Sequence, residues 1–320
     1  MQQYAIRRLL QFIPVVIAVS VIIFLIMRVL PGDVAELVIT GPGGGGAGVT
    51  KEEVTRIRKE LGLDRPLPEQ YVTWISGFAR LDAGKSVWTH SPVFDEVGRR
   101  LPLTMELAIL TLAFSLLFAL PIGILSAMRQ DTWVDYVFRF ISVGGLTMPT
   151  FWIGTLVILA LVLLFHWIPP IGFVNVWEDP LKNLAQVVWP AAVLGYYFSA
   201  VVSRMTRSTM LEVLRQDYVR TAWAKGLKEK VIIMRHAMAN ALLPIITISG
   251  MQFGQLLGGT VITETIFSLP GIGSQLIDAV VFRDYPIVQA VILIMSMWFL
   301  LVNLFVDLLY GWLDPRIRYS

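Results

Sequence analysis

The sequence contains no cysteine and few charged residues. The absence of cysteine among its 320 residues excludes a disulfide framework, a thiolate metal site and a cysteine nucleophile. Charged residues make up 15% of the chain, whereas soluble domains average about 25%. Hydrophobic residues make up 56%, and the mean hydropathy is +0.68. Because the low charge coincides with long apolar runs, the composition predicts a protein whose main solvent is lipid.

The sequence also lacks the common signatures of hydrolases and of nucleic-acid-binding proteins. The histidines are scattered, and neither a His-Glu-x-x-His helix nor a Gly-x-Ser-x-Gly turn occurs, so a zinc protease and a serine hydrolase have no support. The formal net charge is +3, and the basic residues lie between apolar runs, not in a stripe with aromatic residues. We therefore expect no nucleic-acid partner.

One fragment imitates a nucleotide site. Gly84-Lys85-Ser86 matches the end of a phosphate-binding loop, but Ala79 stands where that loop needs its first glycine. The fragment also falls in a segment that we place on the outer side of the membrane, where cytoplasmic ATP is absent. We expect no cofactor and no metal in this chain, and any ATP must be handled by a partner.

Six apolar runs have the length of a membrane span. They cover residues 9–30, 103–128, 138–165, 184–202, 242–266 and 287–309. The first run would rise about 33 Å as a helix, too long for a signal peptide, and Pro31-Gly32-Asp33 follows it without a cleavage signal. Prolines inside the runs predict kinks, because neighbouring helices can satisfy the freed backbone groups; these are Pro14, Pro121, Pro149, Pro190 and Pro244. The sequence thus predicts an all-α integral membrane protein with about six transmembrane helices.

Basic residues in the short loops predict the orientation of these helices. The loops on one side contain Arg129, Arg139 and a basic stretch from Arg204 to Arg235, whereas the short loops on the other side contain only Lys182 and Arg283. The side rich in basic residues is expected to face the cytoplasm. Both chain termini are therefore predicted to be cytoplasmic.

These runs divide the chain into segments. We expect an N-terminal segment with the first helix at 1–30, an extracytoplasmic segment at 31–102, a transmembrane core at 103–309 and a cytoplasmic tail at 310–320. The core includes a cytoplasmic loop at 203–241. The outer segment contains a charged stretch typical of a helix at Lys51–Leu61, followed by aromatic residues, and this combination predicts a small ordered cap. The glycine-rich stretch Gly41–Gly48 predicts a flexible connector.

Glycines recur at every fourth residue in the fifth apolar run. Gly250, Gly254 and Gly258 fall near one face of a helix, which allows another helix to approach closely. We interpret this face as a packing seam, inside the bundle or between two subunits, in preference to a groove that lines a substrate path.

Three acidic residues fall at predicted span ends. Glu106 and Glu264 lie near outer ends, and Asp307 lies near the inner end of the last span. Acidic residues within or near a membrane span are rare and often take part in function. Since groups at span ends can reach water or a basic neighbour, we expect structural pairing in preference to a proton or ion relay.

The cytoplasmic loop contains the most distinctive stretch of the sequence. It predicts a short helix that begins with Asp217 as N-cap and ends at Gly226. Trp223 beside Thr221 and Ala222 is typical of a short helix that fits a protein groove, a role that a merely solvated loop would not require. The stretch comprises Asp217, Tyr218, Val219, Arg220, Thr221, Ala222, Trp223, Ala224, Lys225, Gly226 and Leu227.

With these motifs in place, the whole chain resembles the dipeptide, oligopeptide and nickel branch of the permeases of ABC importers, in particular their B-type subunits. The resemblance rests on several motifs in order. They are Arg7-Arg8, Ile13-Pro14, Pro31-Gly32-Asp33, Glu60 to Asp64, Arg204 to Ser208, Tyr218 to Leu227, Arg235-His236-Ala237, Asn240 to Pro244, Glu264 to Gly271, Arg283 to Pro286 and Asp314 to Arg318.

The resemblance implies a type I importer permease fold in the cytoplasmic membrane of a prokaryote. It implies a second homologous permease, two cytoplasmic ATPase subunits that hold ATP and Mg²⁺, an extracytoplasmic solute-binding protein and surrounding membrane lipid. It also implies that the helix around Arg220 to Gly226 is a coupling helix that inserts into the ATPase. Here the sequence departs from the general importer pattern, because Arg220-Thr221-Ala222 replaces Glu-Ala-Ala, as is usual in this branch, and Trp223 stands where the branch more often has arginine.

The expected function is the import of short peptides, dipeptides or oligopeptides, without enzymatic activity in this chain. Nickel chelates, glutathione and oligosaccharides remain alternatives, because the resembling family has been recruited to all of them. An ion-coupled secondary transporter would normally show a buried midplane carboxylate and repeat-related broken helices, neither of which the sequence shows.

Overall fold

The computed structural model describes residues 2–29, 35, 39, 50–60, 62–168 and 172–313. Pro31-Gly32-Asp33, the connector at Gly41–Gly48 and the motif Asp314 to Arg318 lie outside the described residues. Within the described ranges the chain is helical, with an isolated bridge between Lys85 and Pro92 and no longer strand. The expected all-α class is confirmed.

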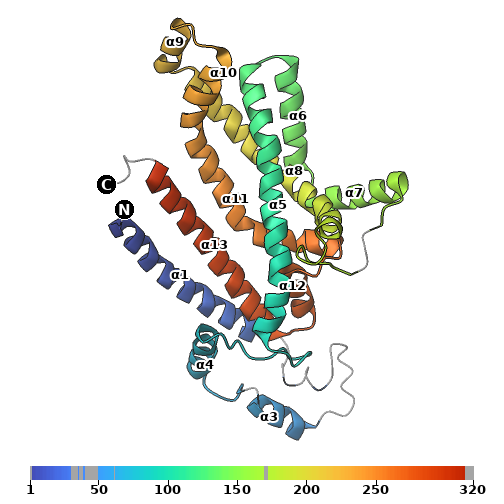
Figure 1. Cartoon of the computed structure of the whole chain (residues 1–320). Helices are drawn as coiled ribbons and strands as arrows, with labels where there is room; N and C mark the ends of the chain where they lie inside the picture. The colour runs from blue at the N-terminus through green and yellow to red at the C-terminus, as the bar shows by residue number, and fades with distance from the viewer. Residues whose placement is uncertain are drawn as a thin grey trace. The chain divides into compact units, whose positions relative to one another are not determined.

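The helices follow one another along the chain as Figure 1 labels them. They are α1 (Gln2–Val29), α3 (Lys51–Glu60), α4 (Leu67–Ala79), α5 (Val93–Met128), α6 (Trp133–Thr147), α7 (Thr150–Phe165), α8 (Pro180–Leu214), α9 (Asp217–Ala224), α10 (Glu229–Val231), the π-helix η1 (Ile232–Ala237), α11 (Met238–Ile266), α12 (Ile272–Val281) and α13 (Tyr285–Leu313).

The number of candidate spans agrees with the sequence. Among the described residues, five stretches are long and apolar enough to cross a membrane, and a sixth arises if α6 and α7 count as one span. Several helices extend beyond the predicted runs: α5 begins at Val93, and α8 continues to Leu214. The predicted cytoplasmic loop at 203–241 is therefore largely helix.

The third predicted span is broken, which corrects the expectation of a simple kink at Pro149. α6 and α7 meet at an angle of 105°. Met148 is extended with a ψ of 128°, as a residue before proline prefers, and Pro149 begins α7 as its N-cap. At Pro14, Pro190 and Pro244 the helices continue, as predicted. What differs at Pro149 is that the preceding residue has left the helical conformation.

The chain divides into two compact units, which we describe separately. The core unit comprises Met1–Ala5, Leu103–Leu269 and Phe299–Ser320. The N-terminal unit comprises Ile6–Pro102 and Pro270–Trp298.

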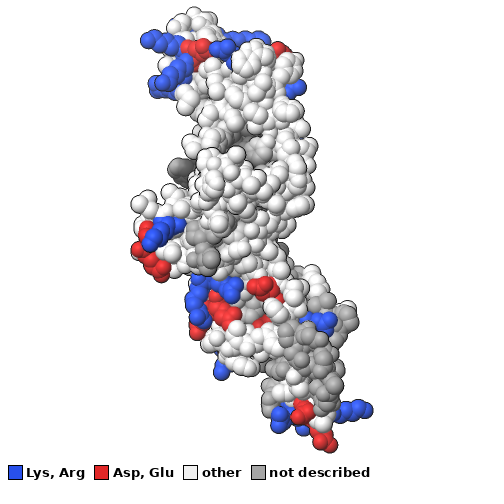
Figure 2. Space-filling view, turned by 90° about the vertical axis from the view of Figure 1, so that its right-hand side faces the viewer, with Lys and Arg blue, Asp and Glu red and all other residues white. Residues whose placement is uncertain are grey.

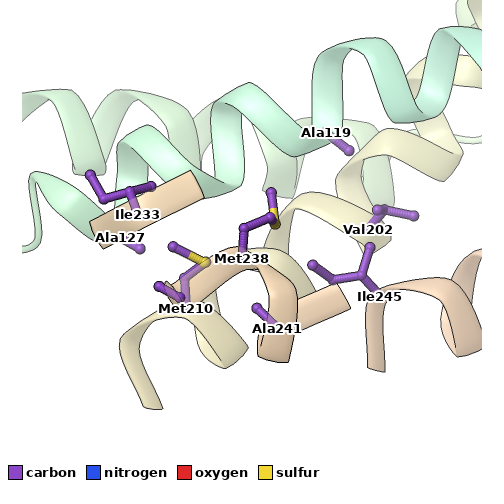
Figure 3. Packing of buried hydrophobic residues seen from close by; sticks show 9 residues of the cluster. Ala119, Ala127, Val202, Met210, Ile233, Met238, Ala241 and Ile245 are labelled. Carbon is purple, nitrogen blue, oxygen red and sulfur yellow. The ribbon is translucent and has the colours of Figure 1, made fainter. Parts of the chain in front are cut away.

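The core unit is held together by apolar and small residues from α5, α8, η1 and α11. Figure 3 shows their buried side chains directed toward one another, including Met210, Ile233 and Ile245. A Cβ on Gly123 of α5 would lie 2.7 Å from the backbone oxygen of Ser203 in α8, so the two helices touch at their backbones. Such close contacts between small residues are the usual means of helix packing in lipid.

The N-terminal unit is organised by aromatic side chains. Phe24 of α1 packs edge-on against Tyr71 of α4, with ring centroids 5.5 Å apart, and Tyr71 also hydrogen-bonds Ser20 at 2.8 Å. Farther along α4, Phe78 contacts Phe94 at the start of α5 with centroids 5.2 Å apart. The aromatic residues of the predicted cap therefore attach it to membrane-spanning helices of the same unit.

Candidate functional site

The short helix α9 lies where the sequence predicts a short helix. It spans Asp217–Ala224, and its N-cap is Gln216, not Asp217. Asp217 is the first helical residue, where its negative charge is favourable at the positive end of the helix dipole. Its carboxylate also accepts a hydrogen bond from Arg220 Nη1 at 3.3 Å. The expected N-cap is thus wrong by one residue.

The end of α9 confirms the predicted role of Gly226. This glycine has a φ of +74°, in the left-handed region that other residues adopt at a cost. Its N–H donates to the carbonyl of Trp223 at 2.9 Å, and the N–H of Leu227 donates to the carbonyl of Ala222 at 3.4 Å. These two bonds form a Schellman motif, which satisfies carbonyls at the helix end and turns the chain toward α10.

A narrow apolar stripe fixes α9 to its own chain. Val219 and Ala222 are buried in a cluster with Ile232 of η1, and Leu214 at the end of α8 packs against it. The sequence interpretation that Ala222 faces a partner is therefore wrong. The spacing of three residues puts Val219 and Ala222 on one face of the helix, and the structure directs that face inward.

The rest of α9 is exposed. Tyr218, Trp223 and, just beyond the helix, Leu227 are 43%, 48% and 37% exposed, and Thr221 is exposed between them. Large apolar side chains gathered on a surface commonly mark a contact with another protein. Lysine and arginine residues gather at the same end of the core unit (Figure 2). The helix thus presents apolar and basic groups together.

One contact connects α9 directly to the long helix α11, and a second connects it to η1, which precedes α11. The side-chain amide of Asn240 donates to the hydroxyl of Tyr218 at 2.8 Å. The other contact is Ile232, at the start of η1, which shares the buried cluster of Val219 and Ala222. Because η1 runs directly into α11, both contacts attach α9 to the same end of α11. Single π-helical turns are frequent at functional positions of long helices.

The glycines of α11 differ in how closely they are packed. A Cβ on Gly250 would lie 2.1 Å from Val306 Cγ2 in α13, and one on Gly254 would lie 3.1 Å from Phe299 Cδ2. A Cβ on Gly258 would meet no atom within 4 Å. Two of the three glycines therefore lie against α13, whereas Gly258 lies at an open surface.

We predict that Gly250→Leu lowers the thermal unfolding temperature of the purified chain and its yield in detergent. Its side chain would overlap Val306, and overpacking typically costs about 1–3 kcal/mol. Gly258→Leu is the matched control, because the same change on the same helix meets open space. Equal unfolding temperatures for the two variants would contradict close packing of α11 against α13 at Gly250.

A buried ion pair that the sequence analysis did not identify joins three helices of the core unit. Asp135 of α6 is fully buried and receives two hydrogen bonds from Arg207 of α8, at 2.8 Å from Nε and 2.6 Å from Nη2. Ser126 of α5 also donates to Asp135. Asp135 falls in the sequence between two predicted apolar runs, its partner lies 72 residues away, and no local pattern pairs them.

Glu106 and Glu264, two of the acidic residues at span ends, accept hydrogen bonds from polar side chains of the chain. Glu264 is fully buried and accepts from Thr104 at 2.7 Å. Glu106 accepts from the side chain of Asn183 at 3.0 Å. Asp307 also has an interaction within the chain. Glu106 and Glu264 are thus paired with polar side chains, but the fully buried Glu264 does not reach water as its place at a span end suggested.

The fragment that imitates a phosphate-binding loop belongs to a folded turn of the N-terminal unit. Ser86 is buried, donates a hydrogen bond to Asp284 before α13, and accepts one from the N–H of Trp88 at 3.3 Å. Burial raises the pKa of the Asp284 carboxyl, and the hydrogen bond from Ser86 opposes that rise. Within the described part of the chain, no three histidine or acidic residues are grouped to hold a metal ion.

Comparison with known proteins agrees with this architecture. Residues 119–319 match the family described as "Binding-protein-dependent transport system inner membrane component", and residues 1–108 match the N-terminal model of such components. The dipeptide transport system permease protein DppB of Alkalihalophilus pseudofirmus is 38% identical, with both chains covered completely. The glutathione transport system permease protein GsiC of Pectobacterium atrosepticum is 37% identical, again over all of both chains.

A further relative is the probable peptide ABC transporter permease protein y4tP of Sinorhizobium fredii, 40% identical over 99% of each chain. Among solved structures, the crystal structure of an amino acid ABC transporter with histidines covers 69% of this chain and 94% of its own, with 17% identity and a TM-score of 0.47. The family match covers most of the chain, and the relatives align from end to end. This chain belongs to the inner membrane components of binding-protein-dependent transport systems, a family of transport permeases and not of enzymes.

Proposed function

We propose that this chain is one of two permease subunits of an ATP-driven importer of short peptides. The relatives named above are permeases for dipeptides, peptides and glutathione, and glutathione is itself a short peptide. These names favour peptides over nickel chelates and oligosaccharides. Family membership sets aside an ion-coupled secondary transporter, because the family depends on a binding protein.

In this proposal the energy comes from other subunits. Two cytoplasmic ATPase subunits hold ATP and Mg²⁺, a second permease completes the translocation path, and an extracytoplasmic binding protein delivers the peptide. Both chain termini are cytoplasmic, and the segments 1–30, 31–102, 103–309 and 310–320 are the first helix, the outer segment, the permease core and the tail. The basic end of the core unit, which carries α9, is then the cytoplasmic end.

The observation that supports the proposal most is the arrangement of α9. Its buried residues attach it to η1 and α8, while Tyr218, Thr221 and Trp223 remain exposed. We propose that this exposed face enters a groove of an ATPase subunit. A helix that is anchored on one side and free on the other can transmit a movement of the partner to the helix behind it.

The movement would reach the bundle through α11. The contact between Tyr218 and Asn240 and the packing of Ile232 tie α9 to the start of this helix. Farther along, α11 lies against α13 at Gly250 and Gly254. We propose that ATP-driven displacement of α9 shifts α11 as a rigid element and so alternates access to the two sides of the membrane.

A reconstitution experiment tests this function. Proteoliposomes with both permeases, both ATPases and the binding protein should accumulate a labelled dipeptide when ATP is present on the ATPase side. Omission of the ATPases or of the binding protein should reduce uptake to the background level. Uptake that persists without the ATPases, or that follows an imposed ion gradient instead of ATP, would contradict the proposal.

A further inference from the structure

The core unit contains an open cavity of about 770 Å³ that the proposed function does not use. Residues from one face of each of the helices α6, α8 and α11 line the cavity. α6 contributes Arg139 and Val143, and α11 contributes Ile248. α8 contributes residues one helical turn apart, among them Val201 and Arg204.

Positive charge in this cavity exceeds negative charge. Three arginines line it, Arg139, Arg204 and Arg207, and none of the lining residues that the structure describes is a carboxylate. Asp135, behind the wall, pairs with Arg207 at 2.6 Å and lies 3.9 Å from Arg139. Within the described part of the chain, Arg204 forms no ion pair. Asp135 therefore lies within 4 Å of Arg207 and Arg139, whereas the charge of Arg204 is not offset by an ion pair and attracts an anion.

The polar and apolar parts of the cavity are ordered along the helices. On α6, Arg139 is nearer than Val143 to the end of the core unit where α8 leads into α9. On α8, Arg207 and Arg204 are likewise nearer that end than Val201, and Arg207 lies about 9 Å beyond Val201 along the axis. The cavity thus has a basic end at the proposed cytoplasmic surface and an apolar end toward the middle of the bundle.

We propose that this cavity binds an anionic phospholipid of the cytoplasmic leaflet. Its phosphate would lie at Arg139 and Arg204, and its acyl chains would pack along Val143, Val201 and Ile248. Basic pockets between membrane helices on the cytoplasmic side are suited to such headgroups. A free phosphate would satisfy the arginines but leave the apolar half empty, whereas a phospholipid matches both halves in the observed order.

The site can be tested by lipid titration of the purified full-length chain, followed by native mass spectrometry. We expect dioleoyl phosphatidylglycerol to bind more tightly than dioleoyl phosphatidylcholine, which has the same chains and no net charge. The double variant Arg139→Gln/Arg204→Gln should weaken binding of phosphatidylglycerol about fivefold for each arginine removed. Binding of phosphatidylcholine should change less than twofold.

The matched control is Lys228→Gln/Lys230→Gln. It removes the same amount of charge from exposed positions at the same end of the core unit, outside the cavity. If the arginine variant does not fold, Ser208→Asp provides a second test, because it places a negative charge in the cavity wall and leaves the pair of Arg207 and Asp135 intact. We expect Ser208→Asp also to weaken the binding of phosphatidylglycerol more than the binding of phosphatidylcholine.

Three results would overturn this proposal. The first is equal affinity for the two lipids, or equal weakening by the arginine and lysine variants. The second is displacement of the lipid by a dipeptide with a free carboxylate but not by its amide, which would assign the cavity to the substrate. The third is loss of the bound lipid when the complete transporter is assembled, which would assign the cavity to contact with the second permease. The titration requires no transport, so its failure is separate from failure of the proposed function.

Discussion

Trp223→Glu is expected to abolish copurification of the ATPase subunits while the chain still inserts and folds. The indole is 48% exposed on α9 and contributes nothing to the buried cluster that anchors the helix. Exposed tryptophan residues often dominate the energy of a protein interface. The substitution removes that contact and places an unpaired carboxylate against the groove, which typically costs several kcal/mol. Since 1.4 kcal/mol is a factor of ten, association should weaken at least about a hundredfold.

The control is Lys228→Glu, which changes the charge of the same loop by more but lies beyond Gly226 at an exposed position. A surface charge contributes about 1 kcal/mol or less, so copurification and peptide-stimulated ATP hydrolysis should remain close to the level of the unmodified protein. If Trp223→Glu behaves like the unmodified protein, or if Lys228→Glu is the more damaging change, α9 is not the coupling helix.

Ala222→Glu does not provide the same test. Because Ala222 is buried against Val219 and Ile232, a glutamate there would disrupt the packing of α9 on its own chain. Loss of ATPase binding in that variant would follow from a misplaced helix as readily as from a lost contact. The structure therefore moves the informative substitution from Ala222 to the neighbouring Trp223.

Asp135→Asn is expected to give the largest loss of stability among the substitutions of polar residues discussed above. The carboxylate is fully buried and accepts two hydrogen bonds from Arg207, whose side chain is 20% exposed. Removal of one member of a buried pair leaves the other charge without compensation, which typically costs about 3–5 kcal/mol. The measurement is the thermal unfolding temperature of the purified chain in detergent.

Asp131→Asn controls for the loss of one negative charge in the same turn. Asp131 is exposed and has a φ of 61°, a conformation that asparagine tolerates well. Its unfolding temperature should therefore stay near that of the unmodified chain. The double variant Asp135→Leu/Arg207→Met should recover part of the lost stability, because it removes both charges together. An Asp135→Asn variant as stable as Asp131→Asn would show that the pair contributes little.

Several features of this chain follow from local patterns. Long apolar runs require helices in lipid, because a helix satisfies its backbone hydrogen bonds within one segment. This reason is enough to predict a helical membrane protein with about six spans. The end of α9 at Gly226 is also local, since a glycine adopts the left-handed conformation at little cost. The motifs that carry the family resemblance needed no structure either.

The sequence predicted a kink at Pro149 but not the sharp break between α6 and α7. Proline interrupts the backbone bonds of any helix, but neighbouring helices decide whether the chain bends slightly or turns away. At Pro190 and Pro244 the helices continue, whereas at Pro149 the two segments diverge by 105°. The same residue type therefore has different outcomes.

The sequence by itself determined that the chain lies in a membrane, that it belongs to a permease family and that a short helix lies in the stretch from Asp217 to Gly226. Only the tertiary structure decided that Ala222 faces inward and Trp223 outward, that Gly250 is tightly packed and Gly258 open, and that Asp135 pairs with Arg207. The physical reason is the distance along the chain between the residues that interact. Burial in lipid and helix termination depend on neighbours along the chain, whereas the exposed face of a helix and the partner of a buried charge depend on residues that only folding brings together.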